Sequence, residues 1–252
     1  MKKVAYLHFK GYEDLVNRTL DLMKQSDTYY RCSFTSFLTP DQIDVVQRVV
    51  GKANKLLFYG GYEQAEMKVA CIAPIYEENI TFPIVALSAK ISKQYSNISH
   101  RDILGAFMHC GIKRSQFGDL CVLEDKIVVF VKEEIADYIC MNVTKIKRTN
   151  ISFEVMKEAL IQQQNVKEVT KIVSGLRLDI LVSSFCQISR TKAQSLILSG
   201  SVKVNYIVLE ETSFLCNNDS TISIRGYGRF CFKEVTGRTK KGNYVILVDI
   251  FR

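Results

Sequence analysis

The segment that begins at Ser189 combines a helix-capping residue with two cations in the turn that follows, Arg190 and Lys192. Serine favours the position before a helix, because its hydroxyl accepts a hydrogen bond from a free backbone N–H group. The first turn of a helix also attracts anions through its unpaired N–H groups and its dipole. Cations oppose that dipole, so their presence there indicates a function rather than a folding role. The predicted chemistry is phosphate binding, and a solvated basic turn stays open as the alternative.

Two later segments place cations beside glycines. Glycine lets the backbone approach a phosphate closely, arginine can donate two hydrogen bonds to it, and tyrosine can stack on a base. Ordinary hairpin turns with exposed charges explain either segment alone, but together with the Ser189 helix they favour a phosphate-rich ligand. The candidate residues in SIRGYGRF and GRTKKGNY are Arg225, Tyr227, Arg229, Arg238, Lys240 and Lys241.

The positive charge of the chain is concentrated at the same end. Over 252 residues, 34 Lys and Arg exceed 26 Asp and Glu, which gives a formal net charge of +8 with neutral histidine. Residues 171–252 hold 12 of these cations and 6 of these acids, a net charge of +6, whereas residues 1–170 hold 22 and 20. A polyanion is therefore expected to bind the last third of the chain.

Other reactive patterns are weaker. The HRD triplet at 100–102 lacks the asparagine and the loops that a kinase needs, but with Asp119 it could in principle perform acid–base catalysis. The RLD triplet at 177–179 resembles the catalytic triplet of pseudouridine synthases, yet Asp179 is interpreted as a helix-opening residue. No glycine-rich loop suits a methyltransferase cofactor.

The eight cysteines form no CxxC pair, so we expect reduced thiols, no metal and no cofactor.

The first of three expected domains, residues 1–76, is predicted to be α-rich. Apolar residues recur at helical spacing in LVNRTLDLMKQ and again from Ile43 to Leu57, where Pro40-Asp41 opens the helix. A Gly60-Gly61 turn then precedes a strand from Val69 to Ile75. We therefore expect a small helical domain that is closed by a strand or hairpin.

The second domain, residues 77–165, alternates strands and helices. The expected elements are a strand at Pro83–Ile91, a helix capped by Ser99 that ends at Gly111, two strands in LCVLEDKIVVFV, a helix in KEEIADYICMNVTKI, and a strand at Ile151–Met156. This β-α-β-β-α-β order is that of a ferredoxin-like, split βαβ fold. The polar stretch IQQQNVKEVTK is interpreted as a linker.

The third domain, residues 166–252, is predicted to be a compact α+β module, which makes the whole chain an α+β protein. Two helices, in RLDILVSSF and RTKAQSLILSG, precede four strands, in VKVNYIVL, STISIR, FCFKEV and NYVILVDIF. No internal repeat is present in the sequence.

This third domain resembles the S-four RNA-binding domain, which is named after a protein of the small ribosomal subunit. The matching motif is RLDILVSSFCQISRTKAQSLILSGSVKVN, followed by DSTISIRGYGRF. One departure is Asn218, where the family usually has glycine; because asparagine tolerates positive φ, we expect the turn to be kept. The resemblance implies that the residues facing structured RNA are Arg177, Arg190, Lys192 and Lys203.

The motifs SHRDILGAFMHCGIKRSQFGDLCV and FYGGYEQAEMKVA extend the resemblance over most of the chain. They resemble the YlmH-type bacterial RNA-binding proteins, which carry an S-four domain at the C-terminus. The resemblance implies a role in ribosome-associated quality control, on a large subunit obstructed by peptidyl-tRNA. Four polar residues of these motifs are candidates for a second RNA contact or for capping and buttressing the fold: His100, Arg101, Lys113 and Arg114.

The leading hypothesis is a noncatalytic RNA-binding factor that acts at ribosomal RNA and tRNA on the large ribosomal subunit. The alternative is an RNA-modifying enzyme, like a pseudouridine synthase or a methyltransferase, that uses the S-four-type domain to bind its substrate. We expect no DNA or membrane partner, because the sequence has no recognition-helix motif and no amphipathic lysine-rich helix. With no signal peptide pattern and no long apolar run, a cytoplasmic protein is expected.

Overall fold

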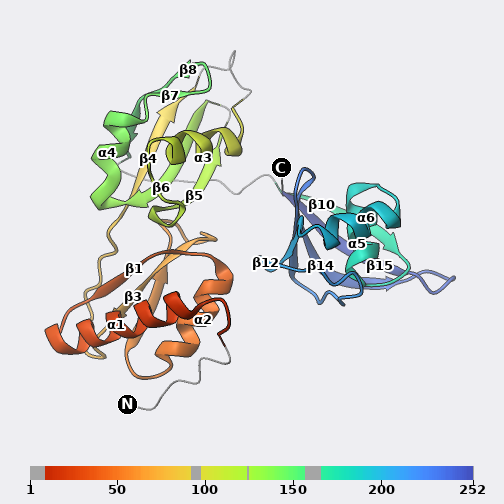
Figure 1. Ribbon diagram of the computed structural model, residues 1–252, viewed down its shortest axis with the longest axis horizontal. Coiled ribbons are helices and arrows are strands. Elements are labelled where there is room, and N and C mark those ends of the chain that lie inside the picture. The colour runs from red at the N-terminus through yellow and green to blue at the C-terminus, as the bar shows by residue number, and fades with distance from the viewer. Residues whose placement is uncertain (1–8, 92–97, 124, 157–165, 252) are drawn as a thin grey trace. The chain divides into compact units, whose positions relative to one another are not determined.

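The computed structural model describes residues 9–91, 98–123, 125–156 and 166–251 (Figure 1). The chain forms two compact units, Met1–Ile161 and Gln162–Arg252, which we call the first and second unit. The first unit contains both the predicted N-terminal and the predicted middle domain. Each unit is described by itself below.

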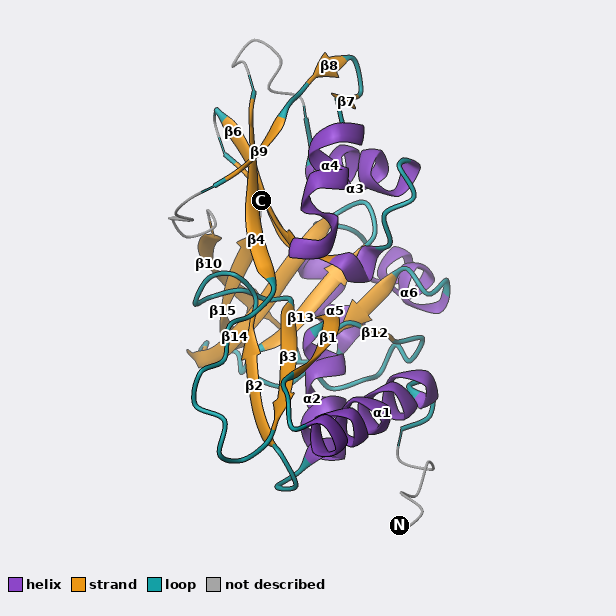
Figure 2. Cartoon of the chain, turned by 90° about the vertical axis from the view of Figure 1, so that its left-hand side faces the viewer, coloured by secondary structure: helices purple, strands orange, loops and turns teal. Residues whose placement is uncertain are grey.

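The N-terminal part of the first unit is a three-stranded antiparallel sheet with two helices packed on it (Figure 2). Its core contains Leu38, Val46, Val50, Ala70 and Ile72. Both predicted helices are present, and the strand order is β1-β3-β2. The elements are α1 (Glu13–Tyr29), β1 (Ser33–Leu38), α2 (Pro40–Val50), β2 (Lys55–Tyr59) and β3 (Lys68–Ala73).

Two features of this part differ from the sequence prediction. The helix expected over Ile43–Leu57 ends at Val50, because Gly51 adopts a φ of 55°, and the residues from Lys55 onward form β2. Strand β1 was not predicted at all. Its inward positions include Ser33 and Thr35. Buried and partly buried residues therefore alternate along the start of the strand, but apolar and polar residues do not. The Thr35 hydroxyl accepts a hydrogen bond from the Ala70 amide at 2.9 Å, which satisfies a group that the β1 bulge frees from the ladder.

The middle part confirms the split βαβ prediction. Its four strands form an antiparallel sheet in the order β5-β6-β4-β9, with the two helices packed on one face. A 3-10 turn at Glu133–Ile135 begins the segment predicted as the second helix, and a short hairpin follows that helix. The elements are β4 (Ile84–Lys90), α3 (His100–His109), β5 (Phe117–Val122), β6 (Lys126–Lys132), α4 (Ala136–Asn142), β7 (Lys145–Ile146), β8 (Thr149–Asn150) and β9 (Phe153–Val155).

The two parts of the first unit share a buried layer. Strand β6 directs Ile127, Val129 and Val131 toward the helices of the middle part, and Val128 and Phe130 toward the N-terminal part. The second layer also contains Phe37 and Val69, from β1 and β3. At Gly118 a Cβ atom would lie 2.5 Å from the Phe37 ring, so glycine permits this approach. The two sequence domains therefore fold against each other as one unit.

The second unit is a six-stranded antiparallel sheet with two helices on one face, in the order β10-β15-β14-β13-β11-β12. Its core combines α5 and α6 side chains such as Leu181 and Ile197 with strand residues such as Ile222, Phe232 and Val248. The elements are β10 (Val166–Val173), α5 (Leu178–Cys186), α6 (Arg190–Leu198), β11 (Val202–Val204), β12 (Ile207–Val208), β13 (Ser220–Ile224), β14 (Gly228–Arg238) and β15 (Tyr244–Phe251).

The linker prediction is wrong for residues 166–171, which belong to β10 and pair with β15 along its length. This edge strand alternates polar with apolar residues on its core side, and its Lys171 ammonium donates to the Ser184 carbonyl at 3.0 Å. Charged residues are common on edge strands, where they prevent pairing with other chains. Here they interrupt the apolar alternation from which a strand is predicted. Residues 161–165 of the predicted linker lie outside the described ranges.

Candidate nucleic-acid interface

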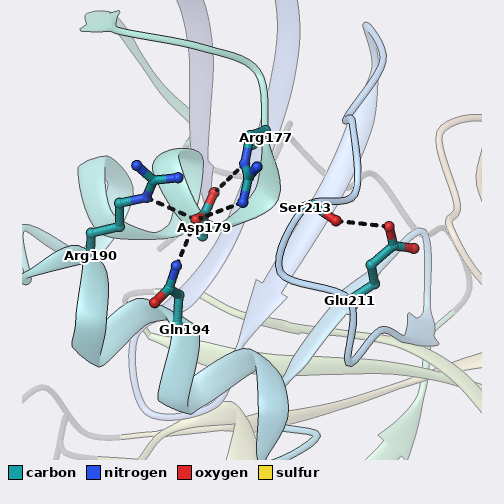
Figure 3. Close-up of polar contacts among 6 residues, drawn as sticks. All are labelled: Arg177, Asp179, Arg190, Gln194, Glu211 and Ser213. Carbon is teal, nitrogen blue, oxygen red and sulfur yellow. Dashed lines mark hydrogen bonds and ion pairs between the residues drawn. The ribbon is translucent and has the colours of Figure 1, made fainter.

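Helices α5 and α6 bring three polar side chains around the buried carboxylate of Asp179 (Figure 3). The Arg177 guanidinium donates to both carboxylate oxygens, through Nε at 3.1 Å and Nη2 at 3.2 Å. Arg190 donates through Nε at 2.8 Å, and Gln194 through Nε2 at 3.0 Å. The Asp179 side chain is 0% exposed, whereas those of Arg177 and Arg190 are 39% and 53% exposed. One carboxylate thus holds two half-exposed guanidinium groups.

The electrostatics of this cluster keep Asp179 ionised. Burial raises the pKa of Asp179, but hydrogen bonds from Arg177, Arg190 and Gln194 outweigh burial and lower the pKa to about 2. Asp179 was predicted to be a helix-opening residue, and it does lie in the first turn of α5. However, the residue before that helix is Arg177, and the role of Asp179 is to hold the two arginines.

The predicted capping role of Ser189 is confirmed. Its Oγ accepts a hydrogen bond from the Lys192 amide at 3.3 Å at the start of α6. The Lys192 side chain is exposed in the same first turn. The Arg190 charge, which appeared costly at this position, is balanced by Asp179, so folding explains part of its presence.

Lys203 and Arg229 lie on the sheet face that points away from the helices, which we call the outer sheet face. Lys203 lies between the buried Val202 and Val204, so its side chain projects to the opposite side. Lys203 pairs with Ser223, and Ser223 pairs with Arg229, so the three side chains form a row across β11, β13 and β14. Lys203 is therefore in a different layer from Arg190 and Lys192.

The Arg229 guanidinium lies over two aromatic rings, 5.5 Å from the Tyr206 centroid and 6.0 Å from that of Phe251. The adjacent β13–β14 turn carries Arg225 and Tyr227, both exposed. Tyr227 stands between Gly226 and Gly228, whose φ angles are 85° and 111°. The glycines thus serve the turn itself, and they leave a cation and a ring at its surface.

The third predicted group, in the β14–β15 turn, lies at the other end of a long strand. Strand β14 runs from Gly228 to Arg238, so this turn is about 30 Å from Tyr227 at roughly 3.3 Å per residue. The Arg238 Nη2 atom donates to the Tyr244 hydroxyl at 3.0 Å, and its guanidinium lies 4.5 Å from the ring centroid. Lys240 and Lys241 are exposed at the tip. The structure therefore separates the predicted candidates into three groups.

Sequence reasoning missed the residues that organise the first group. Neither Asp179 nor Gln194 was a predicted site residue, although the two arginines they hold were. No sequence signal groups them, because Asp179 lies on α5 whereas Arg190 and Gln194 lie on α6. The turn that departs from the S-four pattern keeps a left-handed residue, but that residue is Asp219, with a φ of 60°.

The middle-part candidates fall at the two ends of α3. His100 and Arg101 are exposed in its first turn, and Lys113 is exposed after its end, about 15 Å away along the helix. Arg114 instead buttresses the fold: Nη1 donates to the Phe117 carbonyl at 2.6 Å, and the guanidinium lies 4.7 Å from the Phe117 ring centroid.

The two carboxylates of the alternative acid–base hypothesis have structural partners. Asp102 closes the capping box of α3 with Ser99 and pairs with Lys147 at 2.8 Å, and these contacts lower its pKa to about 2. Asp119 is buried and accepts hydrogen bonds from the Tyr62 hydroxyl at 2.7 Å and from the Glu66 and Met67 amides. Asp119 therefore ties β5 to the N-terminal part of the unit.

The remaining chemistry is sparse. Among the described residues, no group of three or more His, Cys, Asp or Glu side chains could hold a metal ion. All eight cysteines are free thiols, and burial raises the pKa of Cys121 to about 11 and that of Cys216 to about 12. Within the described ranges, no helix is long and apolar enough to cross a membrane.

The fold and the cluster of the second unit define an S4-domain protein, and residues 176–222 match the family model described as "S4 domain". Two further models match the first unit: "YlmH, N-terminal" over residues 12–77, and "Putative RNA-binding domain in YlmH" over residues 78–159. The chain belongs to the YlmH family, as its sequence motifs indicated.

A curated relative supports the same assignment over the full chain. The chain is 32% identical over 250 residues to the "Ribosome-associated protein quality control protein P2" of Bacillus subtilis (strain 168), covering 97% of each chain. A solved structure, "Cell division protein ylmH from Streptococcus pneumoniae", matches 57% of this chain and 90% of its own length, with a TM-score of 0.50 and 20% identity. The solved structure supports the fold alone.

Proposed function

We propose that this protein is a noncatalytic RNA-binding factor that acts on the large ribosomal subunit. The proposal is supported by the S4-domain match and by the full-length similarity to a protein named for ribosome-associated quality control. Its RNA would be ribosomal RNA and tRNA, at a subunit obstructed by peptidyl-tRNA. Such a role takes place in the cytoplasm and needs no cofactor, DNA or membrane partner.

The observation that carries the proposal is the arginine pair held by Asp179, with Lys192 beside it on α6. Arg190 donates to the carboxylate through Nε (Figure 3), and its side chain remains 53% exposed. Three cations against one carboxylate leave two net positive charges. Half-exposed guanidinium groups in a fixed orientation suit the phosphates of a folded RNA, since less side-chain entropy is lost on binding.

The candidate phosphate contacts predict how the binding affinity depends on salt concentration. If binding neutralises about six phosphates, the logarithm of the affinity should fall with the logarithm of the salt concentration at a slope of about −4 to −5. We expect this slope for binding to purified large subunits, measured by co-sedimentation across a salt series. A salt-independent affinity would contradict phosphate binding as the main contribution.

The RNA-modifying alternative makes a different prediction. A catalytic middle domain would change the modified nucleosides of ribosomal RNA or tRNA, whereas a binding factor would not. We expect identical nucleoside profiles, measured by mass spectrometry, from cells with and without the protein. A nucleoside that disappears in its absence and returns with the wild-type chain, but not with Asp102→Asn, would support the enzyme instead.

A further inference from the structure

The first unit carries a short cationic hairpin that none of the sequence candidates included. Strands β7 and β8 pair Lys145 with Asn150 and Ile146 with Thr149, and Lys147 and Arg148 form the turn between them. The hairpin follows α4 and lies at the end of the unit away from α1 and α2 (Figures 1 and 2). Three of the four residues 145–148 are therefore cations, and all three are exposed.

The hairpin is firmly attached to the fold. Ile146 is 0% exposed and belongs to the core cluster of the middle part. Lys147 adopts a φ of 52°, in a two-residue turn where asparagine or glycine is usually favoured. Its ammonium group pairs with Asp102 at 2.8 Å, which connects the turn to the start of α3. A charged residue thus occupies a position that folding alone would assign to a small one.

The charges around this hairpin are unbalanced although the unit as a whole is not. Residues 1–161 contain 21 Lys and Arg against 19 Asp and Glu. At the hairpin, Lys145, Lys147, Arg148 and the exposed Arg101 of α3 are opposed by Asp102, which leaves three net positive charges. Within the part of the chain that the structure describes, Lys145 and Arg148 form no ion pair.

We propose that the β7–β8 hairpin, together with the sequence candidate Arg101, is the surface through which the part that matches the putative RNA-binding model contacts a phosphate backbone. The inference rests on the proposed function, which supplies a large folded RNA. Lys145 and Arg148 provide long cationic side chains on a rigid turn, and the exposed Asn150 side chain beside them can donate to a phosphate or a ribose hydroxyl. An RNA fits this cationic surface because its backbone repeats the same negative charge along its length.

The test is the double charge reversal Lys145→Glu/Arg148→Glu in the full chain. Lys147 is left unchanged, because its ion pair with Asp102 supports α3. The matched control is Arg18→Glu/Lys52→Glu, which reverses an exposed arginine and an exposed lysine elsewhere in the same unit. Binding is measured to purified large subunits and to deproteinised large-subunit RNA, over the same salt series.

We expect the hairpin variant to bind both probes about tenfold more weakly, with a salt slope about 1.4 to 1.8 shallower for two lost phosphate contacts, and the control to bind as wild type. Wild-type binding by the hairpin variant, with weak binding when Arg190 and Lys192 are replaced, would overturn this inference and leave the proposed function standing. Weaker binding to subunits but not to bare RNA would show a protein partner and also overturn it. If neither the hairpin variant nor the variant at Arg190 and Lys192 binds more weakly than wild type, this inference and the proposed function both fail.

Discussion

Replacing Arg190 by glutamine and Lys192 by glutamate is expected to reduce large-subunit binding by about tenfold to a hundredfold. The pair of substitutions removes three units of positive charge from the first turn of α6, where the structure concentrates exposed cations. Loss of two phosphate contacts should also make the salt slope about 1.4 to 1.8 shallower. Binding is measured by co-sedimentation with purified subunits.

The choice of glutamine at position 190 follows from the geometry. Reversal to glutamate would place a second carboxylate beside the buried Asp179 and would confuse unfolding with lost binding. Glutamine can still donate a hydrogen bond to that carboxylate. Arg18→Gln/Lys52→Glu is the matched control, with the same change of charge at exposed positions of the first unit. Equal binding by both variants, with unchanged unfolding transitions, would show that the start of α6 does not contact RNA.

Replacing Asp179 by asparagine is expected to lower the stability of the second unit by about 2 to 4 kcal/mol at pH 7. The substitution leaves two guanidinium groups side by side without the carboxylate that holds them. The expected loss is measured by urea denaturation, followed by a signal from the second unit. Asparagine also frees Arg177 and Arg190 to move, so RNA binding should weaken even at temperatures where the variant is fully folded.

The stability difference between wild type and Asp179→Asn should depend on pH. Folding lowers the pKa of Asp179 from 3.8 to about 2, so the ionised carboxylate stabilises the folded state above pH 4, by about 2 kcal/mol. This contribution is lost as the pH falls through the folded-state pKa, and about half of it should remain at pH 3. The difference between the two proteins should therefore narrow between pH 6 and pH 3. A difference that stays constant over this range would contradict the role assigned to Asp179.

Much of the fold could be predicted because local patterns and burial agree. The middle part has alternating or continuous apolar strands and a helix with both a serine cap and a terminal glycine, and its predicted element order is confirmed. Strands β1 and β10 show where this reasoning fails. Their inward positions include Thr35 and Lys171, whose polar groups find partners that only the folded units provide: the Ala70 amide of β3 for Thr35, and the Ser184 carbonyl of α5 for Lys171.

The candidate site was predictable in its charges but not in its grouping. The sequence shows a serine cap and two cations, and the structure confirms the cap and the exposure of Lys192. The sequence does not show that Arg190 shares Asp179 with Arg177, because the contact between Arg190 and Asp179 joins two helices. Nor does it show that the extended β14 carries the cations of its two ends about 30 Å apart. Both facts depend on how the elements pack.

The central claim, an RNA-binding factor of the large subunit, is tested most directly by crosslinking the full chain to RNA in living cells and sequencing the attached RNA. We predict that ribosomal RNA of the large subunit and tRNA dominate the reads, that the ribosomal reads gather at one site facing the other subunit, and that Arg190→Gln/Lys192→Glu strongly reduces them. Reads scattered over messenger RNA, or an equal yield from that variant, would contradict the account.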